Sequence, residues 1–226
     1  MPSRVARPCR KCSRNDLPAA GDFLLGRLFA RFRVSDSVTT PDDPPRWQTL
    51  TNRTVYENAW IDVSHRDVIA PTGHAGIYGV VHFRNRAVGV VPLDDEGYTW
   101  LVGQWRYTLD TWSWEIPEGG APPDEDPLDA ARRELAEETG LVASRWSPLL
   151  EMHTSNSVTD ETAVAYLARG LTPGDSAPDE TELLTVKRVH LSEAVSMTLD
   201  GRISDGFAMA ALMKVELWRQ SGQLPV

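Results

Sequence analysis

One helix is defined by local chemistry alone, and it limits what the rest of the chain can fold into. Asp126 is a favourable N-cap, Pro127 suits the first helical position, and Gly140 suits the left-handed residue that ends many helices. These residues predict a helix over residues 127–139. Its apolar residues recur at helical spacing and share one face, which we expect to pack on a core: Leu128, Ala131 and Leu135.

A second face of this helix is acidic. Glu134, Glu137 and Glu138 lie within an arc of about 100°. Like charges three or four residues apart destabilise a helix by roughly a few tenths of a kcal/mol per pair, and no lysine occurs between residues 115 and 141 to offset them. On its own, such a face is most often simply solvated. A divalent cation would turn the repulsion into attraction, so a metal site is the alternative.

The remaining pattern predicts a mixed sheet. Short alternating segments bounded by turn residues predict strands at residues 51–56, 61–68, 76–83, 87–93, 99–107, 112–116, 149–152, 162–168 and 184–191. Further helices are predicted at residues 192–199 and 207–219. Strands mixed with helices in this order favour an α/β architecture in which helices cover the faces of the sheet.

Composition excludes several classes of protein. The 226 residues are 41% hydrophobic, which is ordinary for a globular protein. The net charge of −9 repels a phosphate backbone, so we expect no binding to nucleic acid. The longest apolar runs, such as residues 88–93, fall far short of the roughly 20 residues that span a bilayer, so we expect no membrane insertion. Neither a Gly-x-Ser-x-Gly motif nor a P-loop is present.

The first 46 residues differ from the rest. Residues 1–34 hold eight basic and two acidic side chains, and prolines follow before Trp47. We expect residues 1–46 to be a disordered basic extension with a proline-rich linker; a targeting segment and an over-long gene start are the alternatives. Cys9 and Cys12 form a Cys-x-x-Cys, but no further zinc ligands have suitable spacing. A redox pair is the other reading, but the flanking residues lack the apolar periodicity of a strand-to-helix turn. We expect an inert tail with reduced thiols, since cytosolic chains rarely use disulfides, and a cytoplasmic location.

The acidic helix belongs to a longer motif. With its flanks, the segment reads Gly119-x5-Glu125-x7-Arg133-Glu134-Leu135-x-Glu137-Glu138-x-Gly140-Leu141. This pattern resembles the signature of the Nudix hydrolase family, whose members hydrolyse a diphosphate linked to another moiety. The resemblance implies an α/β/α sandwich with a mixed sheet over residues 84–226. Residues 47–83 resemble the small N-terminal antiparallel β subdomain of the ADP-ribose and nucleoside diphosphate sugar pyrophosphatase branch, which commonly supports a homodimer.

The resemblance also implies roles for residues of the motif. Glu134 and Glu138 would bind Mg²⁺, or Mn²⁺ in its place, together with the backbone carbonyl of Glu118, because Mg²⁺ prefers hard oxygen ligands. Glu137 and Glu138 are the catalytic candidates on the helix. One ion pair would fix the loop against the helix: Glu125 and Arg133. Two glycines would let the chain turn tightly from strand to loop: Gly119 and Gly120.

Residues upstream of the motif are candidates for substrate binding. In the resembling branch an arginine at the position of Arg106 reaches the diphosphate, and a guanidinium suits bidentate pairing with phosphate. Trp105 and Tyr107 could stack on a base or could simply pack within the strand, since aromatic residues are common in strands. Glu115 alternates away from its apolar neighbours, so we expect it to face the cleft.

The acid that activates water is expected outside the motif. The resembling branch draws it from a loop between late strands, and Glu182 and Glu180 lie in a matching acidic loop. Acids in loops are otherwise most often solvated. Asn156 stands where ADP-ribose enzymes typically carry a proline, and Thr159 stands where dinucleoside polyphosphate enzymes carry a tyrosine. The substrate within the branch therefore stays open.

Together these features predict Mg²⁺-dependent hydrolysis of a nucleoside diphosphate derivative by a cytoplasmic homodimer. ADP-ribose or a sugar nucleotide would give a nucleoside monophosphate and a sugar phosphate. One alternative is a noncatalytic nucleotide sensor, although sensors often lose motif carboxylates and this chain keeps all of them. Another is a Nudix enzyme for a different nucleoside diphosphate derivative. An isoprenoid diphosphate isomerase would need a cysteine in the cleft, and both cysteines precede residue 46.

Overall fold

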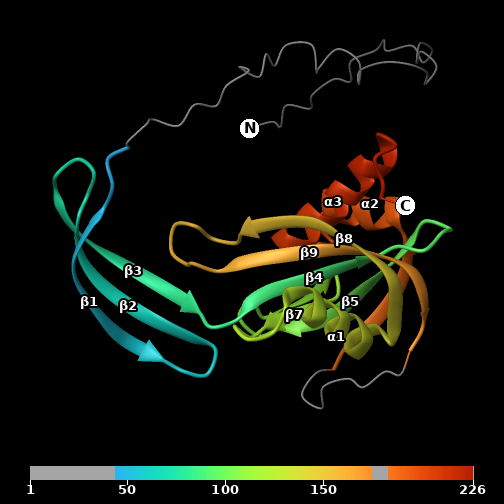
Figure 1. The fold of residues 1–226 in the computed structure, drawn as a ribbon, viewed down its shortest axis with the longest axis horizontal. Helices are drawn as coiled ribbons and strands as arrows, with labels where there is room; N and C mark the ends of the chain where they lie inside the picture. Colours follow the sequence, from blue (N-terminus) through green and yellow to red (C-terminus); the bar gives the residue numbers. More distant parts are fainter. Residues whose placement is uncertain (1–43, 175–182, 226) are drawn as a thin grey trace, which may run out of the picture. The chain divides into compact units, whose positions relative to one another are not determined.

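A three-stranded antiparallel sheet opens the described part of the chain. The computed structural model describes residues 44–174 and 183–225, so the predictions for Cys9, Cys12 and the extension before residue 44 lie outside the described residues. Strands β1 (Gln48–Glu57), β2 (Ile61–Ile69) and β3 (Ala75–Phe83) form a meander in the order β1-β2-β3 (Figure 1). The predicted strands at residues 51–83 are confirmed, each within a few residues.

Two further sheets follow. The first has the order β10-β5-β6 and is antiparallel, with β5 at Tyr98–Arg106, β6 at Thr111–Glu115 and β10 at Thr185–His190. The second has the order β7-β4-β9-β8 and consists of β4 (Arg86–Pro92), β7 (Glu118–Ala121), β8 (Leu141–His153) and β9 (Thr162–Pro173). It is mixed, because β4 and β9 run parallel while the outer pairs are antiparallel.

Three helices complete the described fold: α1 (Pro127–Thr139), α2 (Leu191–Leu199) and α3 (Gly206–Gln220). The predicted limits of α1 are confirmed. The Asp126 side chain accepts a hydrogen bond from the backbone N–H of Leu128, and Gly140 ends the helix at φ 67°, a left-handed conformation that glycine adopts without strain. Within the described residues, no helix is long and apolar enough to cross a membrane.

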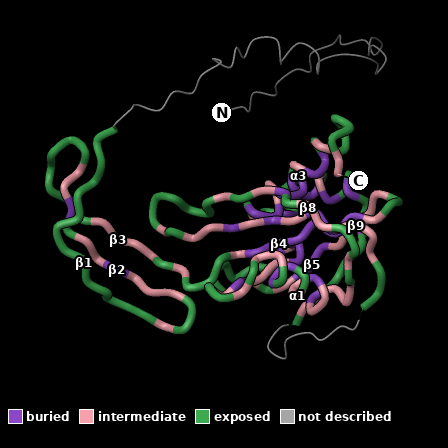
Figure 2. Tube along the Cα trace, in the orientation of Figure 1, coloured by how far each residue is buried: buried purple, intermediate pink, exposed green. Residues whose placement is uncertain are grey.

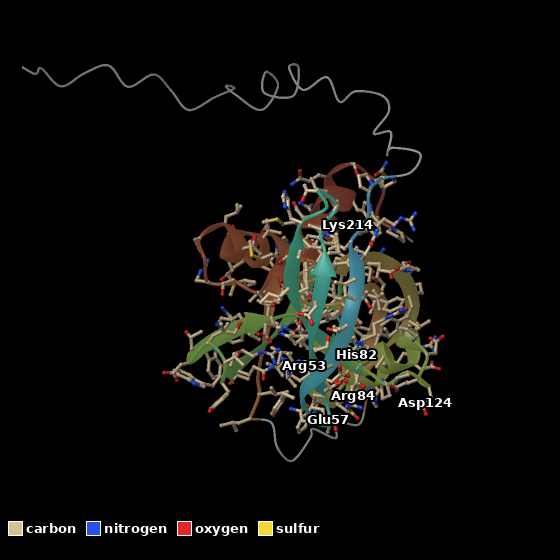
Figure 3. All side chains as sticks on the ribbon, turned by 90° about the vertical axis from the view of Figure 1, so that its left-hand side faces the viewer. Arg53, Glu57, His82, Arg84, Asp124 and Lys214 are labelled. Atoms are coloured by element: carbon tan, nitrogen blue, oxygen red, sulfur yellow. The ribbon has the colours of Figure 1, made fainter. Side chains whose placement is uncertain are left out.

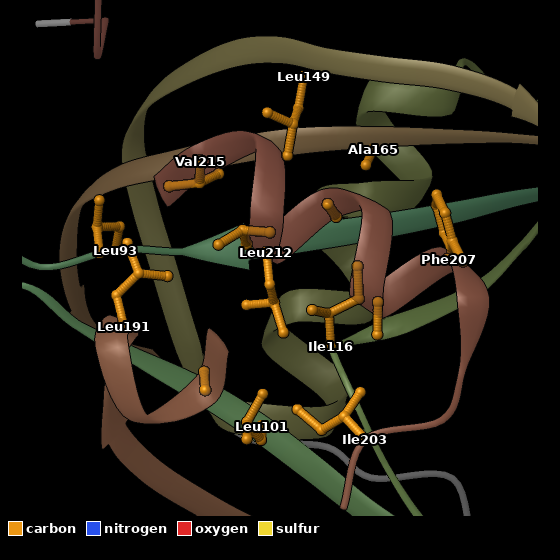
Figure 4. Close-up of a cluster of buried hydrophobic side chains, with 14 of the residues drawn as sticks. Leu93, Leu101, Ile116, Leu149, Ala165, Leu191, Ile203, Phe207, Leu212 and Val215 are labelled. Carbon is orange, nitrogen blue, oxygen red and sulfur yellow. The ribbon is translucent and has the colours of Figure 1, made fainter. Parts of the chain in front are cut away.

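Alternating side chains along the central strands build the predicted α/β/α sandwich. Val88 and Val90 of β4 pack on the side of α1, where Leu135 is fully buried. Val91 points to the opposite side and joins a larger core with Leu212 of α3, which lies at the centre of the cluster in Figure 4. Because neighbouring strand residues point to opposite faces, one sheet can bury apolar side chains under helices on both sides.

Two strands differ from their predicted form. Residues 119–120 were expected to turn from strand to loop, but they pair with β4 as part of β7. Strand β8 was expected only over residues 149–152, and it extends over thirteen residues along β9. The first half of β8 has little apolar alternation, so its sequence does not predict a strand. Pairing with β9 stabilises it there. A bulge after Pro148 accommodates the one residue in β8 that cannot donate to the ladder.

The loop between β8 and β9 is attached to the first sheet. The backbone N–H of Val81 donates to the carbonyl of Val158 at 2.9 Å, and the backbone N–H of Asp160 donates to the carbonyl of Val81 at 3.2 Å. The hydroxyl of Tyr78 donates to the carbonyl of Ser157 at 2.8 Å. Strand β3 therefore positions this loop. On the other edge of the first sheet, every residue of strand β1 is exposed (Figure 2).

Two leucines of α3 provide a test of the core. Leu212 is fully buried, whereas 64% of Leu217 is exposed. Leu212→Ala should lower the free energy of unfolding by about 2–5 kcal/mol, because it removes buried methyl groups and leaves a cavity. Leu217→Ala should change it by less than about 0.5 kcal/mol. Urea unfolding followed by circular dichroism measures both, and equal effects would contradict the packing described for α3.

Candidate active site

The acidic face of α1 lies directly on strand β7. A Cβ atom added to Gly119 would lie 2.1 Å from a carboxylate oxygen of Glu134, which is far inside van der Waals contact. A side chain at residue 119 would therefore push the Glu134 carboxylate away from the backbone of the strand. Glycine at this position permits a close approach of the Glu134 side chain to the strand rather than a tight turn.

Arg133 connects four partners around this contact. Its guanidinium donates to Glu125 at 3.0 and 3.2 Å, to Glu134 at 2.8 Å and to Glu137 at 3.1 Å. It also donates to the backbone carbonyl of Gly120 at 3.1 Å. The hydrogen bond to Glu125 is the main reason that the pKa of Arg133 lies above its ordinary value. The predicted ion pair between Glu125 and Arg133 is confirmed.

Glu138 forms the second link between helix and strand. The residue is buried, and its carboxylate accepts a hydrogen bond of 2.9 Å from the backbone N–H of Glu118. One turn earlier on the helix, Glu134 faces Gly119. The two carboxylates therefore meet consecutive residues of β7, so the structure brings together the three residues predicted as metal ligands.

A second arginine lies beside these carboxylates. Arg106, the last residue of β5, donates to both oxygens of Glu115 at 2.8 and 2.5 Å and to Glu118 at 2.9 Å. Only 2% of Glu115 is exposed, and Gln104 also donates to its carboxylate at 3.3 Å. The hydrogen bond to Glu115 is the main cause that raises the pKa of Arg106. Glu115 therefore holds the guanidinium in place.

Asp205 adds negative charge that sequence reasoning missed. It caps α3 by accepting a hydrogen bond of 2.6 Å from the backbone N–H of Ala208, and it lines a cavity together with Arg106, Glu115 and Glu118. Burial raises the pKa of Asp205. Burial, followed by the charges of Asp205 and Glu115, raises the pKa of Glu118 well above its ordinary value. The preference for Asp at an N-cap was the only signal at this position.

A cleft of about 490 Å³ opens over these groups. Its lining includes Glu118, Gly119 and Gly120 of β7, and Arg106 of β5. Residues of the connection between the first sheet and β4 also line it, as does Glu161 of the β8–β9 loop. We call this space the β7 cleft.

Comparison with known proteins identifies the family. Residues 83–209 match the family model described as NUDIX domain, and residues 47–81 match the model described as Nucleoside diphosphate sugar hydrolase N-terminal domain. The chain is 34% identical over 177 residues to the ADP-ribose pyrophosphatase of Mycobacterium tuberculosis, covering 75% of this chain and 83% of that protein. The chain belongs to the Nudix hydrolase family.

Two further comparisons agree with this assignment. The ADP-ribose pyrophosphatase of Bacillus subtilis is 30% identical over 172 residues, which cover 75% of this chain and 92% of that protein. A crystal structure described as ADP compounds hydrolase superposes with a TM-score of 0.72 at 22% identity, covering 81% of this chain and 100% of that chain. The structural match supports the Nudix fold that was predicted from the sequence.

The Nudix motif residues converge, whereas other candidates lie elsewhere. Trp105 and Tyr107 are 58% and 94% exposed, and neither lines the β7 cleft. Both alternate away from Arg106 along the hairpin. Glu115 does not line the cleft directly, because its carboxylate is bound by Arg106 and Gln104. Glu180 and Glu182 lie outside the described residues.

The donor atoms at the β7 cleft suit a hard divalent cation. Nudix hydrolases generally need a divalent metal ion. Glu134 and Glu138 offer carboxylate oxygens at β7, and one buried oxygen of Glu118 has no hydrogen-bond partner among the described residues. No group of three His, Cys, Asp or Glu within the described ranges forms a ready-made metal cluster. One carboxylate oxygen of Glu134 pairs with Arg133 at 2.8 Å, so we expect a bound cation to compete with this ion pair.

Two glycine variants test the contact between α1 and β7. Gly119→Ala should lower kcat on the order of 10²-fold, because the new methyl group displaces the Glu134 carboxylate from the strand. Gly79→Ala on β3 is the matched control, since its added Cβ meets nothing within 4 Å. Steady-state kinetics and thermal melting of both variants decide the point. Wild-type kcat in folded Gly119→Ala would show that the position of Glu134 is unimportant for turnover.

Proposed function

We propose that the chain hydrolyses the diphosphate bond of a nucleoside diphosphate sugar, with ADP-ribose as the reference substrate, in a Mg²⁺-dependent reaction. The products are a nucleoside monophosphate and a sugar phosphate. One observation carries this proposal. The carboxylates of Glu134 and Glu138, both on α1, lie against β7, and the guanidinium of Arg106 binds Glu118 of the same strand. The names of the relatives and the match of the N-terminal domain support the substrate class.

The residues of the cleft divide the work between binding and metal ligation. Arg106 binds the diphosphate, and Glu115 keeps its guanidinium oriented before the substrate arrives. Glu134, Glu138 and the backbone carbonyl of Glu118 would hold the cation. When bound, Mg²⁺ polarises a phosphoryl oxygen and lowers the pKa of a bound water.

Glu137 has a different position from the other two motif carboxylates. Its carboxylate is partly exposed and accepts a hydrogen bond from Arg133 at 3.1 Å. We assign it an accessory catalytic role, in which it holds water near the cation and balances the charge of Arg133.

The metal site can be tested on one carboxylate. Glu138→Gln keeps the shape of the side chain but removes its charge, so kcat should fall by at least about 10²-fold. The amide oxygen of the introduced glutamine can still accept a hydrogen bond from the backbone N–H of Glu118, so the melting temperature should change little.

EDTA should abolish wild-type turnover, and Mg²⁺ should restore it. Each protein is assayed by phosphorus NMR with ADP-ribose, nucleoside diphosphate sugars, dinucleoside polyphosphates and nucleoside triphosphates.

Two outcomes would contradict the proposed function. Near wild-type turnover in Glu138→Gln would show that Glu138 of α1 does not bind the metal ion needed for the reaction. Absence of hydrolysis with every compound, combined with tight binding of one of them, would favour the noncatalytic sensor.

The general base is predicted to be Glu182 or Glu180. Glu134, Glu137 and Glu138 are expected to be committed to the cation or its waters, so we expect a carboxylate outside α1 to accept the proton of the attacking water. Glu182→Gln should lower kcat by about 10²-fold while KM changes little, because the carboxylate acts mainly in the transition state. Full kcat in both Glu180→Gln and Glu182→Gln would move the base to Asp160 or Glu161 on the β8–β9 loop.

The exposed first sheet supports a homodimer. Every residue of β1 is exposed, including Leu50, Val55 and Tyr56, and Trp60 follows it with 70% exposure. Such a sheet buries too little apolar area by itself, so we propose that a second copy covers it. Light scattering at micromolar concentration should give twice the chain mass of 25.1 kDa. A mass of one chain would contradict the proposed dimer. A cytoplasmic location likewise stays a prediction.

A further inference from the structure

A second cavity adjoins the β7 cleft. Its volume is about 440 Å³, and it shares Phe83, Asn85, Arg86 and Glu161 with the cleft. The two spaces also meet along β7, because Gly120 lines the cleft and the next residue, Ala121, lines the second cavity. A ligand whose diphosphate lies over β7 can therefore extend into this cavity, which we call the distal cavity.

Arg86 stands where the two spaces meet. It is the first residue of β4, pairs in register with Ala121 of β7, and is exposed. Within the part of the chain that the structure describes, its guanidinium makes no hydrogen bond and no ion pair, in contrast to Arg106 and Arg133. Its neighbour Arg84 approaches Glu57 at 3.7 Å (Figure 3). Arg86 is therefore available to an anionic group of a ligand.

Residues of the β8–β9 loop form a polar part of the lining of the distal cavity, and hydrogen bonds hold this part in place. Asp160 lies 2.6 Å from Nδ1 of His82 and accepts a hydrogen bond of 3.2 Å from the backbone N–H of Phe83. These contacts attach the β8–β9 loop to β3 and so define the shape of the wall. Next to it, Glu161 accepts a hydrogen bond of 2.5 Å from Thr154 and has no cationic partner among the described residues. Its remaining lone pairs suit the hydroxyl groups of a sugar.

We propose that the distal cavity binds the sugar moiety of the substrate and that Arg86 pairs with a negative charge carried by that sugar. The preferred substrates are then nucleoside diphosphate sugars whose sugar bears a carboxylate or a further phosphate. Glu161 accepts from the sugar hydroxyls, and Arg106 remains with the diphosphate. This inference rests on the proposed function, because it assumes that the diphosphate lies over β7.

Matched pairs of substrates test the role of Arg86. UDP-glucuronate is compared with UDP-glucose, and ADP-ribose 1″-phosphate is compared with ADP-ribose, so each pair differs by one acidic group on the sugar. The wild-type kcat/KM should favour the acidic member of at least one pair by roughly 10- to 100-fold, the range that a charge-assisted hydrogen bond provides. Arg86→Gln should bring that ratio close to one, mainly through a higher KM for the acidic sugar.

Arg132→Gln is the control for loss of an arginine. Arg132 is exposed on the outer face of α1, where it pairs with Asp129 at 2.6 Å, and it lines neither space. This variant should keep the wild-type ratio. No preference in either pair, or an unchanged preference in Arg86→Gln, would overturn the inference.

Binding measurements separate this inference from the proposed function. Calorimetric titration of the same pairs in EDTA reports affinity without turnover. If the wild type binds the acidic member more tightly and Arg86→Gln does not, the role of Arg86 stands even where no compound is hydrolysed, and only the proposed function fails. Equal affinities within both pairs, together with normal hydrolysis, would overturn the inference and leave the proposed function intact.

Discussion

The network around Arg133 is the interaction on which the rest of the site depends. Three carboxylates share one face of α1, and their mutual repulsion would weaken an isolated helix. Arg133 offsets this repulsion at Glu134 and Glu137 and also donates to the carbonyl of Gly120 on β7. One side chain thus lowers the cost of the acidic face and attaches the helix to the strand at the edge of the mixed sheet.

The cleft beside this network has an excess of negative charge. Arg106 is shared by Glu115 and Glu118, and Asp205 adds a further acid nearby. Burial raises the pKa values of Glu118 and Asp205, because their charged forms lose solvation there. A divalent cation at Glu134 and Glu138 would offset this excess and at the same time provide the charge that an anionic diphosphate needs. The acidic groups gathered beside the cleft therefore favour the binding of a cation.

Local rules predicted the parts of the structure that depend on neighbours in sequence. The limits of α1 follow from its caps, and the Glu125–Arg133 pair follows from the motif. Strands with regular apolar alternation were also predicted, because burial under helices selects that pattern. Glu134 and Glu138 were predicted as metal ligands because they share one helix face and match the motif, and the carbonyl of Glu118 was added from the motif alone, so their role as ligands stays a prediction.

The missed features depend on contacts between distant segments. Strand β7 contains two glycines, which disfavour strands, and it forms because β4 pairs with it and Glu134 lies against it. The availability of Arg86 became visible only after β4, β7 and the β8–β9 loop were placed around the distal cavity. Asp205 looked like an ordinary helix cap in sequence. Its proximity to Glu115 and Glu118 comes from the packing of α3 on the sheet.

The most direct test of the central claim is an anomalous diffraction map from crystals grown with Mn²⁺. Mn²⁺ prefers the same oxygen ligands as Mg²⁺ and can be located without ambiguity from its anomalous signal. We expect a peak within about 2.5 Å of carboxylate oxygens of both Glu134 and Glu138, with Arg133 retaining Glu125 while it releases Glu134. A peak bound by other residues, with Glu134 and Glu138 still engaged as they are here, would contradict the assignment of the acidic face of α1 as the metal site.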